Sequence, residues 1–155
     1  MNKTPVFRRA EPSDAAALTQ IALGAKQSWG YPDEWMAEWR ADLTITPGYI
    51  GSLPVVVAEV EGAAAGFIGL VHTDSHWHLE HLWVLPAWHG RGLGRALFEE
   101  AVRLARAAGA TELCIKSDPN AEAFYLKMGA VRTGHEVYEL LGKIRREVPQ
   151  LSYRL

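Results

Sequence analysis

The segment at residues 82–97, LWVLPAWHGRGLGRAL, limits most strongly what this chain can fold into, because it predicts a strand that passes through a glycine-rich turn directly into a helix. Glycine allows the backbone to bring several N–H groups close to one anion, and the N-terminus of a helix adds a partial positive charge. Arg91 and Arg95 add full charges. The segment therefore predicts a phosphate-binding turn in a domain that mixes strands and helices. The glycines of this turn are Gly90, Gly92 and Gly94.

Two common nucleotide-binding motifs do not fit this turn. The dinucleotide fingerprint G-x-G-x-x-G would need glycine where Arg95 stands, and the chain contains no P-loop of the form G-x-x-x-x-G-K-[ST]. Glycines at a strand-to-helix turn also occur for close packing alone. The turn by itself thus leaves two interpretations open, a phosphate ligand of another class or a structural role.

The spacing of apolar residues predicts the other elements. Helical spacing indicates helices at residues 13–25, 35–43, 92–108 and 118–128. Alternating or continuous apolar runs indicate strands at residues 5–9, 53–60, 65–73, 76–84, 112–116, 130–133 and 151–155, with residues 134–150 unassigned. The short connections at residues 61–62 and 74–75 favour antiparallel pairing. We therefore expect a single α/β domain over residues 1–155, with a largely antiparallel, twisted sheet of about seven strands flanked by four helices.

Composition and charge agree with such a domain and exclude several functions. The chain has 155 residues, of which 48% are hydrophobic, enough for a core without disulfides, and its lone Cys114 cannot pair within the chain. The chain has 16 Lys and Arg and 18 Asp and Glu, and it contains no long run of residues with the same charge. We therefore expect no nucleic-acid partner. No apolar stretch has the length of a signal peptide or membrane span. We expect a cytoplasmic protein with no membrane partner, and a homodimer is compatible with the sequence.

Two segments together carry a family resemblance. The turn reads HGRGLG at residues 89–94, and DPNAEAFYLKMGA at residues 118–130 places Tyr125 four residues before Gly129. In both segments the chain resembles the GNAT superfamily of acetyl-CoA-dependent N-acetyltransferases, whose signature is Q/R-x-x-G-x-G/A and whose last helix carries a tyrosine at this distance from its closing glycine. The order of expected elements is similar along essentially the whole chain. His89 departs from the usual Gln or Arg.

The resemblance implies transfer of an acetyl group from acetyl-CoA to a primary amine by direct attack on the thioester. It implies that the backbone N–H groups of Leu82 and Val84 polarise the thioester carbonyl, and that Asn120 contacts the pantetheine arm. The residues expected to bind the co-substrate are Leu82, Trp83, Val84, His89, Gly90, Arg91, Gly92, Leu93, Gly94, Arg95, Asn120 and Tyr125.

Acetyl transfer needs a base for the amine and an acid for the departing thiolate. Alternation along the strand at residues 76–84, without a bulge, places Glu80 and His78 on the face of Leu82 and Val84, with His81 on the other face. Glu80 is the first candidate base and His78 the second. Glu80 could instead pair with an arginine across the sheet, and His78 could be an ordinary surface histidine. Tyr125 is the candidate acid, with core packing as its alternative.

Two other functions remain open at this stage. His76, His78 and Glu80 could bind zinc in a metal-dependent hydrolase, although we expect no metal. A non-catalytic acyl-CoA binding module would keep the glycine turn without needing an acid or a base. For an acetyltransferase, we expect the acceptor to be a small molecule or an exposed peptide N-terminus. We expect Trp29 and Tyr31 to bind it, because aromatic side chains can cover an apolar or cationic group.

Overall fold

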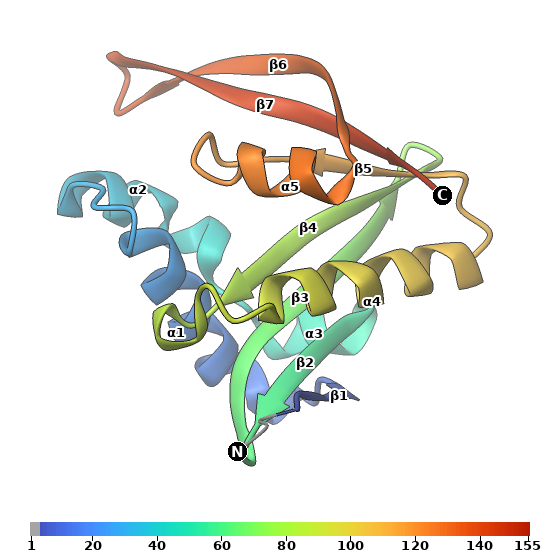
Figure 1. Cartoon of the computed structure of the whole chain (residues 1–155). Helices are drawn as coiled ribbons and strands as arrows, with labels where there is room; N and C mark the ends of the chain where they lie inside the picture. Colours follow the sequence, from blue (N-terminus) through green and yellow to red (C-terminus); the bar gives the residue numbers. More distant parts are fainter. Residues whose placement is uncertain (1–3) are drawn as a thin grey trace.

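The computed structural model describes residues 4–155 and has one seven-stranded sheet with strand order β1-β2-β3-β4-β5-β7-β6 (Figure 1). The strands are β1 (Val6–Arg9), β2 (Val55–Val60), β3 (Ala63–Thr73), β4 (His76–Val84), β5 (Glu112–Lys116), β6 (Val131–Leu140) and β7 (Ile144–Arg154). All neighbouring strands are antiparallel except β4 and β5. The predicted α/β class and largely antiparallel sheet are confirmed.

The parallel pair β4–β5 shapes the middle of the sheet. The two strands are paired only from Trp77 opposite Leu113 to Leu79 opposite Ile115. Beyond Leu79 they diverge, as Figure 1 shows, and the end of β4 leaves one backbone edge without a strand partner in residues 4–155. The sheet is therefore open beside the end of β4.

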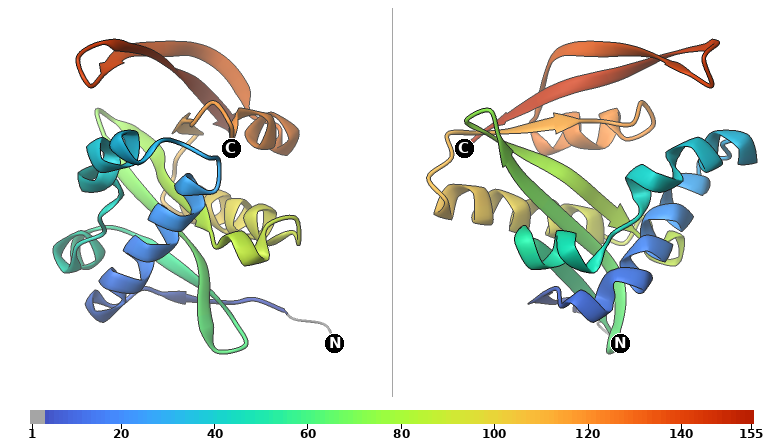
Figure 2. Two further views of the ribbon diagram at one scale, coloured as in Figure 1. Left: turned by 90° about the vertical axis from the view of Figure 1, so that its left-hand side faces the viewer. Right: turned by 180° about the vertical axis from the view of Figure 1, so that it is seen from behind.

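Helices cover both faces of the sheet. They are α1 (Ala15–Gln27), α2 (Asp33–Leu43), α3 (Pro47–Ser52), α4 (Leu93–Ala107) and α5 (Glu122–Met128). The first three contribute to one apolar core and the last two to another, and the left view of Figure 2 shows α1 and α4 on opposite sides of the sheet. No helix within residues 4–155 combines the length and apolarity needed to cross a membrane.

Helix α4 forms where its apolar spacing predicts. Leu93, Leu97 and Ala101 are buried at successive turns and pack against the sheet. The helix ends before Gly109, whose φ of +84° is a left-handed conformation that glycine adopts without a Cβ clash. This strongly amphipathic helix fixes the glycine turn that precedes it.

The predicted start of one helix was wrong, and one short helix was missed. Helix α5 begins at Glu122 and not at Asp118, because the Asp118 carboxylate accepts the backbone N–H of Asn120 at 2.8 Å and folds residues 118–121 into a turn. Helix α3 was not predicted. Pro47 occupies its first turn and Thr46 Oγ1 accepts the N–H of Tyr49 at 3.1 Å, so that local capping makes a short helix without a long apolar pattern.

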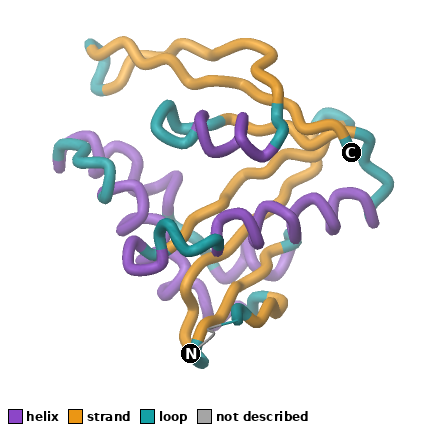
Figure 3. The backbone as a smooth tube through the Cα atoms, viewed as in Figure 1, coloured by secondary structure: helices purple, strands orange, loops and turns teal. Residues whose placement is uncertain are grey.

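The C-terminal strands are longer than predicted. Strands β6 and β7 form a hairpin that includes the unassigned residues 134–140 and 144–150, and Figure 3 shows it as a long two-stranded ribbon. Gly134 lies at a register shift and Gly142, with φ of +68°, lies in the turn, so neither glycine ends a strand. Pro149 lies within β7 and its carbonyl accepts the N–H of Ser117 at 2.9 Å.

Candidate active site

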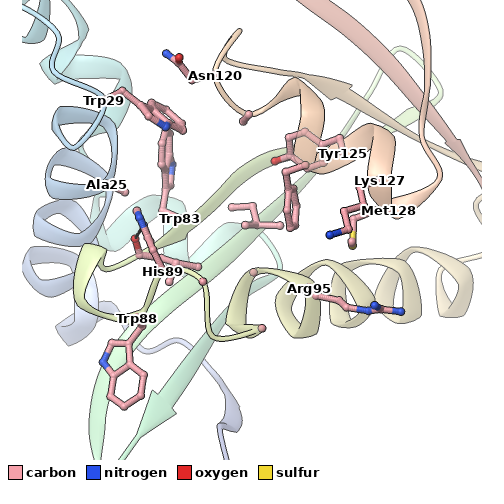
Figure 4. A pocket seen from close by; sticks show the side chains of 17 residues that line it. Ala25, Trp29, Trp83, Trp88, His89, Arg95, Asn120, Tyr125, Lys127 and Met128 are labelled. Atoms are coloured by element: carbon pink, nitrogen blue, oxygen red, sulfur yellow. Dashed lines mark hydrogen bonds between the residues drawn. The ribbon is translucent and has the colours of Figure 1, made fainter.

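A cavity of about 460 Å³ lies beside the open end of β4, between the turn before α4 and helix α5 (Figure 4). Most of the residues that sequence analysis selected line it. These are Trp29, Leu82, Trp83, Val84, His89, Gly90, Gly92, Gly94, Arg95, Asn120 and Tyr125. Ala25, Trp88, Ala121, Phe124, Lys127 and Met128 also line it and were not selected. Arg91, Leu93, Tyr31, Glu80 and His78 are not among the lining residues.

The glycine turn is shaped by backbone conformation. Gly90 and Gly92 have φ of +73° and +84°, and a Cβ atom on either would meet no atom within 4 Å. Their left-handed conformation therefore requires glycine, and the open space beside them leaves the backbone accessible. Gly94 differs, since its Cβ would lie 3.3 Å from the Phe124 ring. The turn leads into the 15-residue helix α4, whose first N–H groups and partial positive charge suit an anion.

Arginine and lysine side chains stand near this turn. Arg95 and Lys127 line the cavity (Figure 4), where they suit the phosphates of a nucleotide. Arg91 instead lies over the Trp88 ring, 5.0 Å from its centroid. The side chain of Leu93 is buried in the core, so this residue can contribute to an anion site only through its backbone.

The backbone N–H groups of Leu82 and Val84 point toward the cavity side of β4. The N–H of Leu85 bonds the Ala65 carbonyl of β3 at 2.8 Å, and the N–H groups of successive strand residues alternate in direction. Those of Leu82 and Val84 therefore point to the edge that β5 has left. This is the geometry expected for polarising a thioester carbonyl.

His89 has a structural contact that its departure from Gln or Arg did not predict. Its Nε2 donates a hydrogen bond of 2.7 Å to the Val84 carbonyl oxygen. The imidazole thus satisfies an acceptor on the open edge of β4 and ties the glycine turn to the strand end. Figure 4 shows the His89 side chain on the cavity wall.

Tyr125 projects from α5 into the cavity. Its ring packs against Phe124 and Phe98, with centroid distances of 5.1 Å and 6.0 Å. Burial raises the pKa of its phenol, which is therefore protonated at neutral pH. Figure 4 shows the hydroxyl directed into the cavity. The ring thus packs in the core while its hydroxyl faces the cavity.

The expected alternation along β4 was wrong beyond Leu79. A register shift makes Glu80 an extra residue between His81, opposite Gly69, and Leu79, opposite Leu70. Leu79 and Leu82 both pack on the α4 side, so the bulge shifts the alternation and His78 lies on the face opposite Leu82, not on the same face as expected. His81 is buried toward α3, on the face opposite Leu82, as expected. Glu80 is exposed and accepts a hydrogen bond of 2.8 Å from the Tyr49 hydroxyl, not from an arginine.

His81 supports the cavity wall, a role that the alternation did not suggest. The Trp83 indole donates a hydrogen bond of 3.0 Å to Nδ1 of His81. Burial lowers the pKa of His81, although the charges of Glu80 and Asp42 oppose this shift. A neutral imidazole is required for Nδ1 to accept, so the burial and the hydrogen bond favour the same form.

His78 lies farther back on β4, opposite Cys114 of β5 and Val71 of β3, where it is half-buried. The His76 and His78 ring centroids are 6.5 Å apart, and His76 Nδ1 is 2.8 Å from the Asp74 carbonyl oxygen. Among residues 4–155, no three His, Cys, Asp or Glu side chains are grouped so that they could hold a metal ion.

Trp29 and Asn120 form the end of the cavity opposite Arg95 and Lys127 (Figure 4). Trp29 packs near Trp83, with centroids 6.1 Å apart. The Asn120 amide donates to the Tyr31 hydroxyl at 2.9 Å, so Tyr31 lies directly behind this wall. This end is suited to an acceptor molecule that approaches the strand edge.

Comparison with known proteins places the chain among acetyltransferases. Residues 15–130 match the family model described as acetyltransferase (GNAT) family. An aminoglycoside N(6')-acetyltransferase type 1 of Stenotrophomonas maltophilia is 32% identical over 146 residues, which cover 86% of this chain and 91% of that protein. A GCN5-related N-acetyltransferase from Rhodopseudomonas palustris has a similar structure, with a TM-score of 0.83 and 24% identity over 100% of this chain and 99% of that one. The PaiA N-acetyltransferase of Thermoplasma acidophilum, solved with coenzyme A, has a TM-score of 0.75 and 17% identity over 98% and 99%.

Proposed function

The chain belongs to the acetyltransferase (GNAT) family, and on this premise we propose that it acetylates a primary amine of a small molecule or an exposed peptide N-terminus within the cavity beside β4. It is an N-acetyltransferase, and acetyl-CoA is its co-substrate and supplies the acetyl thioester. The expected family and activity are thereby confirmed. The residues that carry out each step are our proposal.

The glycine turn and the start of α4 bind the pyrophosphate of the co-substrate in this proposal. The left-handed Gly90 and Gly92 expose backbone N–H groups, and Arg95 and Lys127 supply positive charge at the same end of the cavity. At the other side of the turn, the N–H groups of Leu82 and Val84 stabilise the negative charge that develops on the carbonyl oxygen. Asn120, which lines the cavity wall, contacts the pantetheine arm in this proposal.

Tyr125 gives its proton to the departing thiolate. Its hydroxyl faces the cavity and burial keeps it protonated, so the acid is in the correct form when the carbon–sulfur bond breaks. Glu80 takes the proton of the ammonium group through water, because it is exposed and does not line the cavity itself. His78 remains the second candidate base.

One observation carries the proposal: a single cavity brings together the glycine turn, the open edge of β4 and the Tyr125 hydroxyl. The test is the release of free coenzyme A thiol from acetyl-CoA in the presence of a panel of amines. Acceptor-dependent release with formation of the amide is expected. If acetyl-CoA binds but no amine in the panel is acetylated, a non-catalytic acyl-CoA binding role is favoured. We expect the reaction to occur in the cytoplasm, without a nucleic acid or membrane as partner.

The relative from Stenotrophomonas maltophilia bears the name of an aminoglycoside N(6')-acetyltransferase. Aminoglycosides therefore belong in the amine panel, beside small neutral amines, amino acids and short peptides. The charges near the acceptor end of the cavity narrow the class of amine that we expect as the acceptor.

A further inference from the structure

A polar cluster lies directly behind the acceptor end of the cavity, with the Tyr31 hydroxyl at its centre. This hydroxyl donates to the Asp118 carboxylate, whose two oxygens both lie 3.0 Å away. It accepts from the Asn120 amide at 2.9 Å and from Nη2 of Arg146 at 3.1 Å. Since Asn120 lines the cavity, one phenol oxygen links the cavity wall to the guanidinium of β7.

The charges of this cluster do not balance. Lys26 pairs with Asp118 at 3.1 Å, so these two charges compensate each other. Arg146 has the Tyr31 and Tyr138 hydroxyls as neighbours and forms no ion pair with an acidic side chain among residues 4–155, and its Nε is buried without a hydrogen-bond acceptor there. A buried donor without an acceptor is costly. One positive charge and one buried donor are therefore left over beside the acceptor end.

Aromatic rings near the cluster already hold cations of the chain itself. The Arg146 guanidinium carbon lies 5.1 Å, 5.3 Å and 5.5 Å from the ring centroids of Tyr31, Trp35 and Trp39. Lys26 Nζ lies 4.0 Å from the Trp39 centroid. These ring faces would otherwise suit an ammonium group of the acceptor. Because they are occupied, this region presents positive charge and not a free cation site.

The cavity wall adds no negative charge. Its charged lining residues are Arg95 and Lys127, and no Asp or Glu lines it. Arg95 is paired with Glu99 at 3.1 Å, which leaves Lys127 at that end and Arg146 behind the acceptor end as the cationic groups near a polycationic acceptor, and like charges disfavour its binding. Trp29 is 36% exposed and offers an aromatic surface at the same end.

We propose that the acceptor is an amine that also carries a carboxylate, with the carboxylate bound by Arg146 and an apolar body resting on Trp29. Guanidinium groups form strong, directional hydrogen bonds with carboxylates. Such an acceptor matches the unpaired charge of Arg146, while its amine extends toward the open edge of β4. This inference rests on the proposed acetyltransferase function and narrows its substrate class.

The test compares each amino acid with its own carboxamide, which keeps the amine but removes the negative charge. The panel contains L-phenylalanine, L-methionine and the spacing series β-alanine, 4-aminobutyrate and 6-aminohexanoate, with the aminoglycoside kanamycin as the polycationic arm. For the best acceptor we expect the acid to exceed the amide about tenfold or more in kcat/KM, mainly through KM. In Arg146→Gln this acid-to-amide ratio should fall toward one, and Arg146→Lys should restore part of it.

Arg145→Gln is the matched control. Arg145 is the neighbouring residue on β7, carries the same charge, and is exposed and paired with Glu147 at 2.9 Å. This variant should keep the acid-to-amide ratio of the parent. Circular dichroism and the melting temperature show whether Arg146→Gln is folded. If it is not folded, Arg146→Lys, which keeps the positive charge but not the guanidinium, takes its place in the comparison.

The outcomes separate the inference from the function on which it rests. Equal use of acid and amide by the parent, preference for kanamycin, or an unchanged ratio in Arg146→Gln overturns the carboxylate inference while acetyl transfer stands. If no amine is acetylated, the proposed function fails. Binding of the acids and amides, measured by calorimetry in the presence of coenzyme A, then tests the carboxylate inference separately. Selective binding of the acids that is lost in Arg146→Gln supports the inference. Equal binding of acids and amides contradicts it.

Discussion

The Tyr49 hydroxyl donates a hydrogen bond of 2.8 Å to Oε2 of Glu80, so a residue of α3 holds the carboxylate at the bulge of β4. Burial, and next the hydrogen bond to Glu80, raise the pKa of Tyr49. This phenol therefore keeps its proton and remains a hydrogen-bond donor to the carboxylate. The contact orients one oxygen of Glu80 and leaves the exposed carboxylate able to accept a proton through water.

Replacing Glu80 with Gln tests this carboxylate as the base. If Glu80 accepts the proton of the amine, Glu80→Gln should lower kcat about 10- to 1000-fold, because general-base assistance is lost. Affinity for acetyl-CoA, measured by calorimetry, should stay near that of the parent.

Two further variants sharpen this experiment. Tyr49→Phe keeps the carboxylate but removes its hydrogen bond, so it should reduce kcat less than Glu80→Gln does. Glu38→Gln changes an exposed carboxylate on α2 and serves as the control. Parent-like turnover of Glu80→Gln would assign the residue a structural role and make His78 the next base to examine.

Substitution of Gly92 tests the phosphate-binding turn. Gly92→Asp places a side chain on a backbone with φ of +84° and a negative charge beside the pyrophosphate. Since a ligand that binds only the folded state raises its melting temperature, acetyl-CoA should stabilise the parent and have little effect on this variant. Thermal shift over a series of acetyl-CoA concentrations measures the difference.

Gly109→Asp controls for backbone strain. Gly109 has the same φ of +84° and equally open surroundings, but it lies past the far end of α4. This variant should lose stability and still respond to acetyl-CoA as the parent does. Equal stabilisation of Gly92→Asp and Gly109→Asp by acetyl-CoA would show that the glycine turn does not bind the co-substrate.

Tyr125→Phe tests the acid. Loss of the phenol should lower kcat about 10- to 1000-fold with little change in acetyl-CoA affinity, because the ring that packs in the core is kept. Burial raises the pKa of Tyr125, so its own deprotonation should affect the parent only at strongly alkaline pH, and the variant should lack that alkaline decline. Tyr153→Phe is the control, since Tyr153 also packs on Phe98 but does not line the cavity. A kcat equal to that of the parent would leave Tyr125 a packing residue.

Sequence predicted the parts of the site that depend on local patterns. The glycine turn, Arg95 and Tyr125 each lie in one short segment whose spacing can be read directly, whereas Arg91 of the same turn lies over Trp88. The face of Glu80 could not be read in this way. A single extra residue in β4 reverses the alternation, and that bulge is set by pairing with β3 and not by a pattern within β4 itself.

The acceptor end could not be predicted for a different reason. Tyr31, Asp118 and Arg146 come from segments far apart in the chain, and only the docking of β7 beside the α1–α2 connection brings them together. Asp118 carries the local signal of a helix start, and nothing in that signal indicates that its carboxylate also contacts Lys26 and Tyr31. No short-range spacing encodes such a cluster.

His81 gives a prediction for stability against pH. Burial lowers the pKa of His81 in the folded protein below its ordinary value of 6.5. Between those two pKa values the unfolded chain binds more protons than the folded one, so the free energy of unfolding falls as the pH falls below about 6.5. Protonation also removes the acceptor that Nδ1 offers to the Trp83 indole, 3.0 Å away. The melting temperature should therefore decline from pH 7.5 to pH 5 partly through this residue.

His81→Gln isolates that contribution, because its amide oxygen can accept from Trp83 but does not titrate in this range. The parent should lose more stability than this variant between pH 7.5 and pH 5, and each 1 kcal/mol of difference corresponds to about 2–4 °C in melting temperature. His135→Gln, at an exposed position on β6, controls for removal of a histidine and should follow the parent. If His81→Gln and the parent lose stability in parallel, the buried imidazole does not cause the loss of stability at low pH. The position of Trp83 in the cavity wall is then independent of the charge of His81.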